Sequence, residues 1–149
     1  MAAMFKIEVV TPDATALAAD ASALQVPAWE GYLGVLANHA PLLCVLKPGV
    51  LTITQDDRKR YLAVRGGFME VGENRVKILA DEIADAQKQN RGTLEAALEQ
   101  AKQPIGEVTG ATAEDRENAR EDRTRERELK ILWTEARLKA LQLHEEEGA

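Results

Sequence analysis

The side chains best suited to catalysis or metal binding are few and scattered in this sequence. His39 has an imidazole for proton transfer or metal binding, but the other histidine, His144, lies in the C-terminal region. No cysteine or pair of carboxylates near His39 has the pattern of a zinc site or a catalytic triad. Cys44 is better explained as a small buried hydrophobic residue than as a nucleophile. The sequence therefore predicts no catalytic residue and no metal site, and His39 is expected to support the fold or to contact a partner.

Two glycines shortly before His39 resemble part of a phosphate-binding loop. Gly31 and Gly34 lack the downstream Gly-Lys-Ser/Thr of such a loop, and no helix follows whose N-terminus would bind an anion. We therefore predict that both are turn glycines and that this segment binds no nucleotide.

Four arginines in the C-terminal region form a regular pattern. Arg116, Arg120, Arg123 and Arg127 recur at steps of three and four residues, so a helix would place them along one side. Acidic residues flank them, which favours a solvated helix whose charges pair with one another. The alternative is a basic surface for an acidic partner, and the sequence leaves both interpretations open.

The composition limits the class of protein. The 149 residues carry 19 basic and 25 acidic side chains, a formal net charge of −6, which disfavours binding to nucleic acid or to an anionic membrane surface. A single cysteine excludes an intramolecular disulfide and fits a reducing compartment. The N-terminus shows no leader pattern, and no apolar run reaches the ~18 residues of a membrane span. We expect a soluble protein with one core plus an appendage, which reaches a membrane only through a partner.

The first part of the chain, up to about residue 80, has the pattern of a sandwich of antiparallel strands. Short segments with period-two alternation, such as Phe5, Ile7 and Val9, are separated by turn-forming residues. The further strand candidates are Ala23 to Val26, Val50 to Thr54, Arg60 to Arg65, Phe68 to Val71 and Val76 to Leu79. No helix-length segment fits between them, which excludes parallel βαβ units.

After residue 80 the hydrophobic period becomes that of a helix. Thr93, a candidate N-cap after Gly92, precedes apolar residues at helical spacing, and Pro104 ends that pattern. We predict helices at about residues 93–103 and 113–146, joined by a flexible linker at 104–112. The second helix carries an apolar stripe that needs a cover, either the first helix, the sandwich or another protein. The stripe consists of Leu129, Leu132, Trp133, Ala136, Ala140 and Leu143.

Together these patterns predict an α+β fold in two parts. An N-terminal antiparallel β-sandwich occupies residues 1–86, and a C-terminal α-helical hairpin occupies residues 87–149. One possible function is an adaptor whose apolar helical stripe forms a dimeric coiled coil. Another is a small hydrolase that pairs His39 with a carboxylate, which requires a pocket containing both groups.

The segment from Glu30 to Leu43 reads Glu-Gly-Tyr-Leu-Gly-Val-Leu-Ala-Asn-His-Ala-Pro-Leu-Leu. It resembles the signature of the epsilon subunit family of bacterial F-type (F1Fo) ATP synthases, in which a Gly-x-x-Gly turn leads into Asn/Gly-His-Ala-Pro-Leu. Three later motifs reinforce the resemblance in the same order, namely Lys47-Pro48-Gly49, Gly66 to Val71 and Val76 to Asp81. The motifs cover most of residues 4–83, and the order of strands followed by helices is also that of the family.

The resemblance implies a non-catalytic rotor subunit that couples proton transport through the membrane ring to ATP synthesis. Its sandwich would bind the gamma subunit and the polar loops of the c-ring, and its helical arm would meet the alpha and beta subunits transiently and inhibit ATP hydrolysis. The implied contact residues for gamma and the c-ring are Glu30, Gly31, Tyr32, Gly34, His39, Ala40, Pro41 and Leu42. The candidate inhibitory arm carries Arg116, Arg120, Arg123, Arg127 and Arg137.

The resemblance also bears on cofactors and location. Many bacterial members bind ATP through Ile/Leu-Asp-x-x-Arg-Ala at the start of the first helix, but residues 85–92 lack that pattern, so no cofactor is predicted. Tyr32 stands where the family often has a polar or acidic residue. The implied location is peripheral, on the cytoplasmic face of the bacterial inner, energy-coupling membrane, with a plastid-encoded origin as the alternative.

Overall fold

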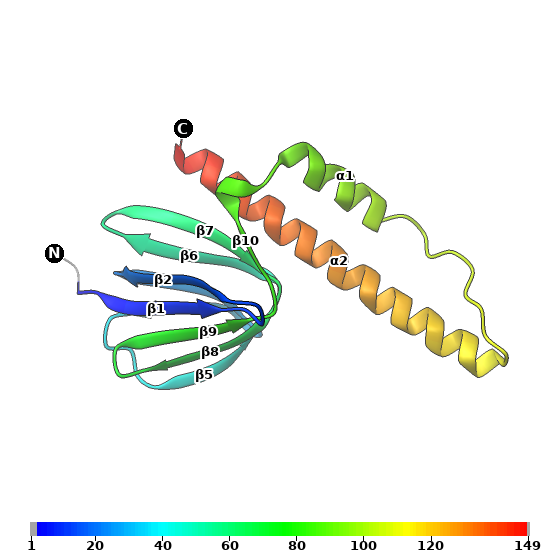
Figure 1. The fold of residues 1–149 in the computed structure, drawn as a ribbon, viewed down its shortest axis with the longest axis horizontal. Helices are drawn as coiled ribbons and strands as arrows, with labels where there is room; N and C mark the ends of the chain where they lie inside the picture. The colour runs from blue at the N-terminus through cyan, green and yellow to red at the C-terminus, as the bar shows by residue number, and fades with distance from the viewer. Residues whose placement is uncertain (1–2, 149) are drawn as a thin grey trace.

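The computed structural model describes residues 3–148, which form a β-sandwich with two helices along one side (Figure 1). The strands are β1 (Phe5–Val10), β2 (Thr15–Ala21), β3 (Ala23–Ala28), β4 (Gly31–Leu36), β5 (Leu42–Leu46), β6 (Gly49–Gln55), β7 (Arg58–Val64), β8 (Gly67–Gly72), β9 (Arg75–Ala80) and β10 (Ile83–Asp85). The helices are the short 3-10 helix η1 (Ala86–Lys88), then α1 (Arg91–Ala101) and α2 (Ala113–Gly148). The predicted fold class, a sandwich followed by a helical region, is confirmed.

Two layers of strands enclose the main core. The hydrogen-bonded order is β10-β7-β6-β3-β5-β8-β9-β1-β2, and β4 pairs with the other side of β3. The layers join where β3 meets β5 at the Ala28–Leu46 pairing. Side chains that alternate inward from both layers are shielded from water, and this burial stabilises the sandwich. The largest of them are Ile7, Leu24, Leu51, Ile53, Met69 and Ile78.

One strand pairing departs from the predicted antiparallel arrangement. β1 runs parallel to β9, with Ile7 opposite Val76 and Val9 opposite Ile78. The period-two pattern identifies each strand separately, but it does not identify the neighbour of a strand. The two strands lie at opposite ends of the β region of the sequence, so only the assembled core selects this pairing.

The strand prediction omits β2, β4, β5 and β10, and the assignment of Gly34 to a turn is wrong. Gly34 lies within β4 and pairs with Gln25 of β3. Gly31 begins the same strand at a φ of 135°, which is a conformation that favours glycine. Two glycines within six residues weaken the alternation of side chains, and this explains why the pattern failed to reveal β4.

Strands β6 and β7 are buried on both faces. Leu51 and Leu62 point into the sandwich, whereas Val50, Tyr61 and Ala63 pack on the outside against α2. The contacting residues of α2 are Trp133, Ala136 and Ala140, with Leu143 partly buried beside them. The cover for most of the predicted apolar stripe is therefore the sandwich itself.

The remaining two leucines of the predicted stripe do not join this contact. Leu129 and Leu132 are exposed, because they precede the part of α2 that packs on the sheet. The first half of α2 projects beyond the sandwich, as Figure 1 shows.

Neither helix in the described part of the chain combines the length and the apolar content that crossing a membrane requires.

Both helices begin at side-chain caps. Asn90 is the N-cap of α1, and its Oδ1 accepts a hydrogen bond from the backbone N–H of Thr93 at 3.0 Å, so the predicted cap at Thr93 is wrong. At the start of α2, the hydroxyl of Thr112 accepts from the N–H of Asp115 at 3.0 Å, and the carboxylate of Asp115 accepts from the N–H of Thr112 at 2.9 Å. This reciprocal pair fixes where α2 begins.

A glycine substitution in β8 tests the sandwich. Gly67 has a φ of 139°, and a Cβ there would overlap the carbonyl oxygen of Leu79 on β9. Gly67→Ala is therefore expected to lower the free energy of unfolding by about 3 kcal/mol or more, since it combines steric overlap with backbone strain. Gly34→Ala is the matched control, because its Cβ would meet nothing within 4 Å, and a change within about 1 kcal/mol is expected. The measurement is urea unfolding, and equal midpoints for the two variants would contradict the packing described.

Candidate functional site

The predicted contact residues for gamma and the c-ring lie in two groups at opposite ends of β4. Residues 30–32 occupy the turn between β3 and β4 and the first positions of β4, and Gly34 points outward from its middle. Residues 39–42 follow the other end and lead into β5. Because β4 has six residues, the groups are separated by about 17 Å at 3.3 Å per residue. Residues 39–41 therefore lie apart from residues 30–32, whereas Leu42 lines one groove together with residues 30–32.

The group around His39 is held by local polar contacts. Asn38 has a φ of 59° and donates its N–H to the Asn74 side chain at 2.7 Å, and Asn74 donates to the carbonyl of Met4 at 3.0 Å. His39 is half-buried, with its Nδ1 2.7 Å from the carbonyl oxygen of Ala40. Since Leu42 is half-buried against the core, this group leaves mainly Ala40 and Pro41 exposed.

The group at residues 30–32 borders an aromatic tip, which we define as Trp29 and Tyr32. Trp29 is 70% exposed although its N–H donates to the carbonyl of Val45 at 3.1 Å. The Tyr32 hydroxyl accepts a hydrogen bond from the N–H of Val50 at 3.3 Å, which holds the exposed ring in place. Both aromatic residues line a groove of about 690 Å³ together with Val45 and Cys44. Burial raises the pKa of the Cys44 thiol.

An apolar row, consisting of Val45, Phe68 and Leu79, continues from this tip across the outer face of β5, β8 and β9. The three residues are direct cross-strand partners, and their exposed fractions are 48%, 52% and 49%. Large apolar side chains grouped on a surface in this way mark an interaction site. The row is absent from the sequence-based predictions, although consecutive apolar residues in β5 and β8 require that one of each neighbouring pair points outward.

Charged side chains lie beside the apolar row on the same face. Glu70, Lys77 and Glu8 are cross-strand partners on β8, β9 and β1, and all three are exposed. An apolar centre beside alternating charges is the usual composition of a protein interface. The outer face of β5, β8, β9 and β1 is therefore the best candidate surface for a protein partner.

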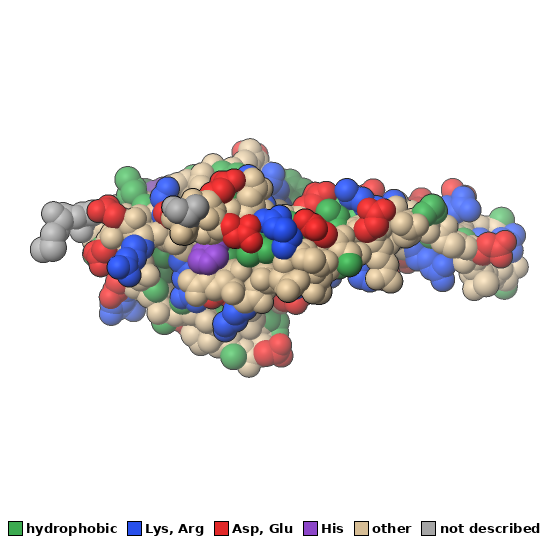
Figure 2. Space-filling model, turned by 90° about the horizontal axis from the view of Figure 1, so that it is seen from above, with side chains coloured by type: hydrophobic (Ala, Val, Ile, Leu, Met, Phe, Trp, Pro, Cys, Tyr) green, Lys and Arg blue, Asp and Glu red, His purple; other side chains and the backbone are tan. Residues whose placement is uncertain are grey.

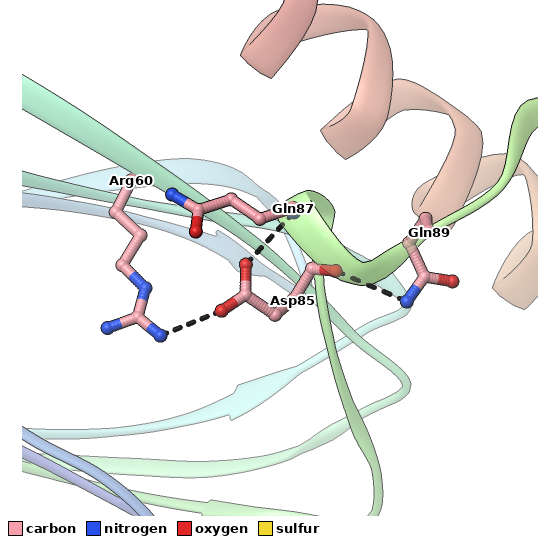
Figure 3. A network of polar contacts seen from close by, with 4 residues as sticks. All are labelled: Arg60, Asp85, Gln87 and Gln89. Carbon is pink, nitrogen blue, oxygen red and sulfur yellow. Dashed lines mark hydrogen bonds and ion pairs between the residues drawn. The ribbon is translucent and has the colours of Figure 1, made fainter.

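A polar junction connects the sandwich to the helices (Figure 3). Arg60 on β7 donates to the Asp85 carboxylate at 2.8 Å, and the same carboxylate accepts from the N–H of Gln87 at 3.1 Å. Gln89 donates to the carbonyl of Asp85 at 3.2 Å. Burial acts to raise the pKa of Asp85, but the hydrogen bonds from Arg60 and Gln87 outweigh it, so that the pKa lies below its ordinary value. Asp85 is therefore held as a carboxylate at the base of the hairpin.

The same junction holds α2. Arg137 donates to the Gln89 side chain at 2.9 Å and places its guanidinium 5.6 Å from the ring centroid of Trp133. Nearer the C-terminus, Arg91 of α1 forms an ion pair with Glu145 of α2. Arg137 is thus half-buried in the junction, whereas the other four candidate arm residues lie on the projecting half of α2.

The projecting half of α2 carries basic and acidic side chains interspersed along its length (Figure 2). Arg116 donates to the carbonyl of Gly110 and Arg123 to that of Glu107, both at 3.0 Å. Arg127 donates from Nε to Ala101 and Gln103, each at 3.1 Å, and from Nη2 to Lys102 at 2.7 Å. These three arginines therefore contact peptide carbonyls rather than the acidic side chains of their own helix. Between residues 113 and 128 the ion pair present is Arg125–Asp122, at 3.9 Å.

Over residues 3–148, no three His, Cys, Asp or Glu side chains are grouped so that they would hold a metal ion.

The fold and these surfaces define a class of protein, namely a small β-sandwich that has an apolar outer face and carries a helical hairpin on a polar junction. Residues 4–86 match the family model described as the β-sandwich domain of the ATP synthase delta/epsilon chain. The chain belongs to this family of ATP synthase subunits. The family resemblance inferred from the sequence motifs is confirmed.

Sequence relatives agree with this assignment, and two solved structures share the fold. The ATP synthase epsilon chain of Solibacter usitatus is 43% identical over 96 residues, which span 64% of this chain and 72% of the relative. That of Pelotomaculum thermopropionicum is 38% identical over 104 residues, spanning 70% and 78%. A chain of the Euglena gracilis mitochondrial ATP synthase (OSCP/F1/c-ring) shares the fold with a TM-score of 0.72 at 23% identity, over 95% of this chain and 83% of that chain. A Tetrahymena thermophila chain (central stalk/c-ring) gives a TM-score of 0.56 at 18% identity, over 89% and 98%.

Removing the charge of Asp85 tests the junction. Asp85→Asn is expected to destabilise the protein by about 1–2 kcal/mol at pH 7, because Arg60 loses a charged and largely buried partner. The folded-state pKa is lowered, so the wild-type advantage is fully present above the unfolded pKa of about 3.9 and is lost as pH falls through the folded pKa. Urea midpoints at pH 7 and at a pH below the lowered folded pKa of Asp85 measure this difference.

Glu82→Gln is the matched control for this experiment, since the Arg65–Glu82 pair is longer, at 3.4 Å, and exposed on both sides. Its expected effect is close to zero, within about 0.5 kcal/mol. An Asp85→Asn effect no larger than that of Glu82→Gln would contradict the role of the junction.

Proposed function

We propose that this chain is a non-catalytic central-stalk subunit that helps to couple proton transport through the c-ring to ATP synthesis. Its place would be peripheral, on the cytoplasmic face of the energy-coupling membrane. The observation that carries the proposal is the apolar row of Val45, Phe68 and Leu79, continuous with the aromatic tip and bordered by charges. A rigid sheet with such a surface is suited to transmit force through a partner rather than to perform chemistry.

The gamma subunit is the proposed partner of the apolar row. Large apolar side chains at the centre of an interface contribute most of the binding energy when a partner covers them. Glu70, Lys77 and Glu8 would lie at the rim and fix the orientation of the partner. Membership of the family and the fold shared with chains from solved assemblies described as central stalk and c-ring support this assignment.

The polar loops of the c-ring are the proposed partner of the residues beside the aromatic tip. Glu30 is exposed in the turn next to Trp29, and Tyr32 presents its ring to solvent while its hydroxyl is held by Val50. This tip projects at the same end of the sheet as Val45, so one rigid element would contact both partners. Trp29 extends the contact set that was inferred from the sequence.

The hairpin is the proposed regulatory arm. The arginines on the projecting half of α2 would meet acidic surfaces of the alpha and beta subunits transiently and oppose ATP hydrolysis. No nucleotide is part of this proposal. The acidic side chain within residues 85–92, that of Asp85, forms an ion pair with Arg60.

The two other candidate functions are less well supported. A dimeric coiled coil would use the apolar stripe of α2, but Trp133, Ala136 and Ala140 are buried against β6 and β7. A hydrolase would use His39, but the ring nitrogen Nδ1 lies against a backbone carbonyl rather than a carboxylate. Neither alternative accounts for the apolar row.

Phe68→Ser tests the binding of gamma. The substitution is expected to weaken binding of the purified gamma subunit about ten-fold or more, equivalent to about 1.4 kcal/mol, because it removes the centre of the apolar row. Leu36→Ser is the matched control, since Leu36 is also exposed but lies on β4, outside the row. Binding by isothermal titration calorimetry measures both variants. Equal affinities for wild type and Phe68→Ser would refute the assignment of this surface.

Replacing the four arginines 116, 120, 123 and 127 with alanine tests the arm. In the assembled enzyme this variant is expected to raise ATPase activity about five-fold if about 1 kcal/mol of inhibitory coupling is lost. A variant with Arg125→Ala and Lys130→Ala removes two charges from the same helix as a control. Truncation after Gln103 is less clean, because it would expose Val50 and Tyr61 on the sandwich. Unchanged activity in the four-arginine variant would count against inhibition by these residues.

A further inference from the structure

Three arginines of α2 contact the segment that connects the two helices, residues 102–112, and the last carbonyl of α1. Arg116 and Arg123 each donate to one carbonyl of the linker, and Arg127 donates to the last carbonyl of α1 and to the first two carbonyls of the linker. We propose that these arginines form a latch, the arginine clasp, which fixes the linker along α2 and occupies the side chains that the arm would present to a partner. The identity of that partner rests on the proposed function, but the clasp is a property of the isolated chain.

The contacts of the clasp run in antiparallel order along the helix. Arg127 contacts carbonyls 101–103, Arg123 contacts Glu107 and Arg116 contacts Gly110. The linker therefore runs along α2 in the direction opposite to that of the helix. From Arg116 to Arg123 the helix rises about 10.5 Å over seven residues. From Glu107 to Gly110 an extended chain spans about 10–11 Å over three residues. The spacing of these two arginines therefore matches an extended linker segment.

The length of the linker alone does not fix its position along α2. The helix rises about 21 Å from Ala113 to Arg127. The ten peptide steps from Gln103 to Ala113 can reach about 33–36 Å when extended, so the linker has slack. A free coil of nine residues would sample end-to-end distances with a root mean square of about 17 Å. Holding the linker against the helix thus requires contacts, and Arg116 and Arg123 provide them.

Arg127 has a second role in the clasp, as an anchor for α1. The last carbonyls of a helix have no partner within the helix, and residues 98–101 of α1 contain no basic side chain that would interact with them. Arg127 reaches from α2 and donates to the carbonyls of Ala101, Lys102 and Gln103. Arg127 therefore holds the end of α1 against α2, while Arg116 and Arg123 hold the linker, and together these contacts keep the hairpin closed.

The clasp competes with binding of the arm to a partner. Arg127 donates from both Nε and Nη2, so it has to release these carbonyls before that edge can form a bidentate pair with a carboxylate. Arg116 and Arg123 donate from Nη1, so a partner that draws either side chain away from the linker has to break that hydrogen bond. Arg120 differs, because over residues 3–148 its side chain donates no hydrogen bond and forms no ion pair. It is thus a natural comparison residue on the same half of the helix.

Distance measurement between spin labels tests the clasp in the full-length isolated chain. Labels at Thr109→Cys on the linker and Glu121→Cys on α2, in a Cys44→Ala background, report the position of the linker. The clasp predicts one narrow distance distribution. The pair Arg116→Gln and Arg123→Gln is expected to broaden it to a spread on the order of 10 Å, approaching that of a free coil.

The matched control is the pair Arg120→Gln and Arg125→Gln, which removes the same number of charges from the same half of α2 but no hydrogen bond to the linker. It is expected to keep the narrow distribution, and circular dichroism confirms that both double variants retain the helices. A narrow distribution in the Arg116/Arg123 variant, or equal broadening in the control, would overturn the clasp. Because gamma is absent from this measurement, its outcome is independent of the proposed assembly with the rotor.

Discussion

The burial of β6 and β7 on both faces is the constraint on which the rest of the structure depends. Their inner side chains, such as Leu51 and Leu62, complete the sandwich core, but Val50, Tyr61 and Ala63 would remain exposed without a cover. α2 provides that cover and thereby fixes the side of the sandwich on which the hairpin lies. The opposite layer, with its apolar row, is not covered by the helices. One molecule thus presents a helical arm on one side and an exposed apolar row on the other.

The contact between α2 and the sandwich is smaller in apolar content than the core. α2 contributes one large buried side chain, Trp133, and the partly buried Leu143, whereas Ala136 and Ala140 bury little area each, and burial stabilises by about 25 cal/mol per Å². Polar groups surround this contact. Burial, and after it the carboxylate of Glu147, raise the pKa of Tyr61 to about 12, so the phenol stays neutral beneath the helix. A contact built in this way is compatible with an arm that separates while the sandwich stays folded.

The sequence predicts the individual strands and helices of this molecule better than it predicts which of them lie next to one another. Alternation in β1 and the helical period around Trp133 identify a strand and a helix, because both patterns are local. The parallel neighbour of β1 and the exposed position of Phe68 depend on how distant strands assemble. The signature from Glu30 to Leu43 identifies the family, yet it spans both ends of β4, so residues 39–41 lie apart from residues 30–32, whose groove Leu42 shares. A continuous motif in sequence therefore forms a continuous site only in part.

The hydrogen-bond acceptors of the α2 arginines could not be predicted from the sequence either. Their spacing predicts a basic ridge, and neighbouring acids suggest that the helix neutralises itself, because side-chain pairs are what a sequence displays. The actual acceptors are backbone carbonyls of residues 101–103, 107 and 110, which every residue possesses and no pattern marks. Since a carbonyl carries no net charge, these contacts leave the ridge basic while they occupy some of its N–H donors. The same arginines therefore hold the closed hairpin and retain the charge that an acidic partner would need, which couples the position of the linker to the availability of the arm.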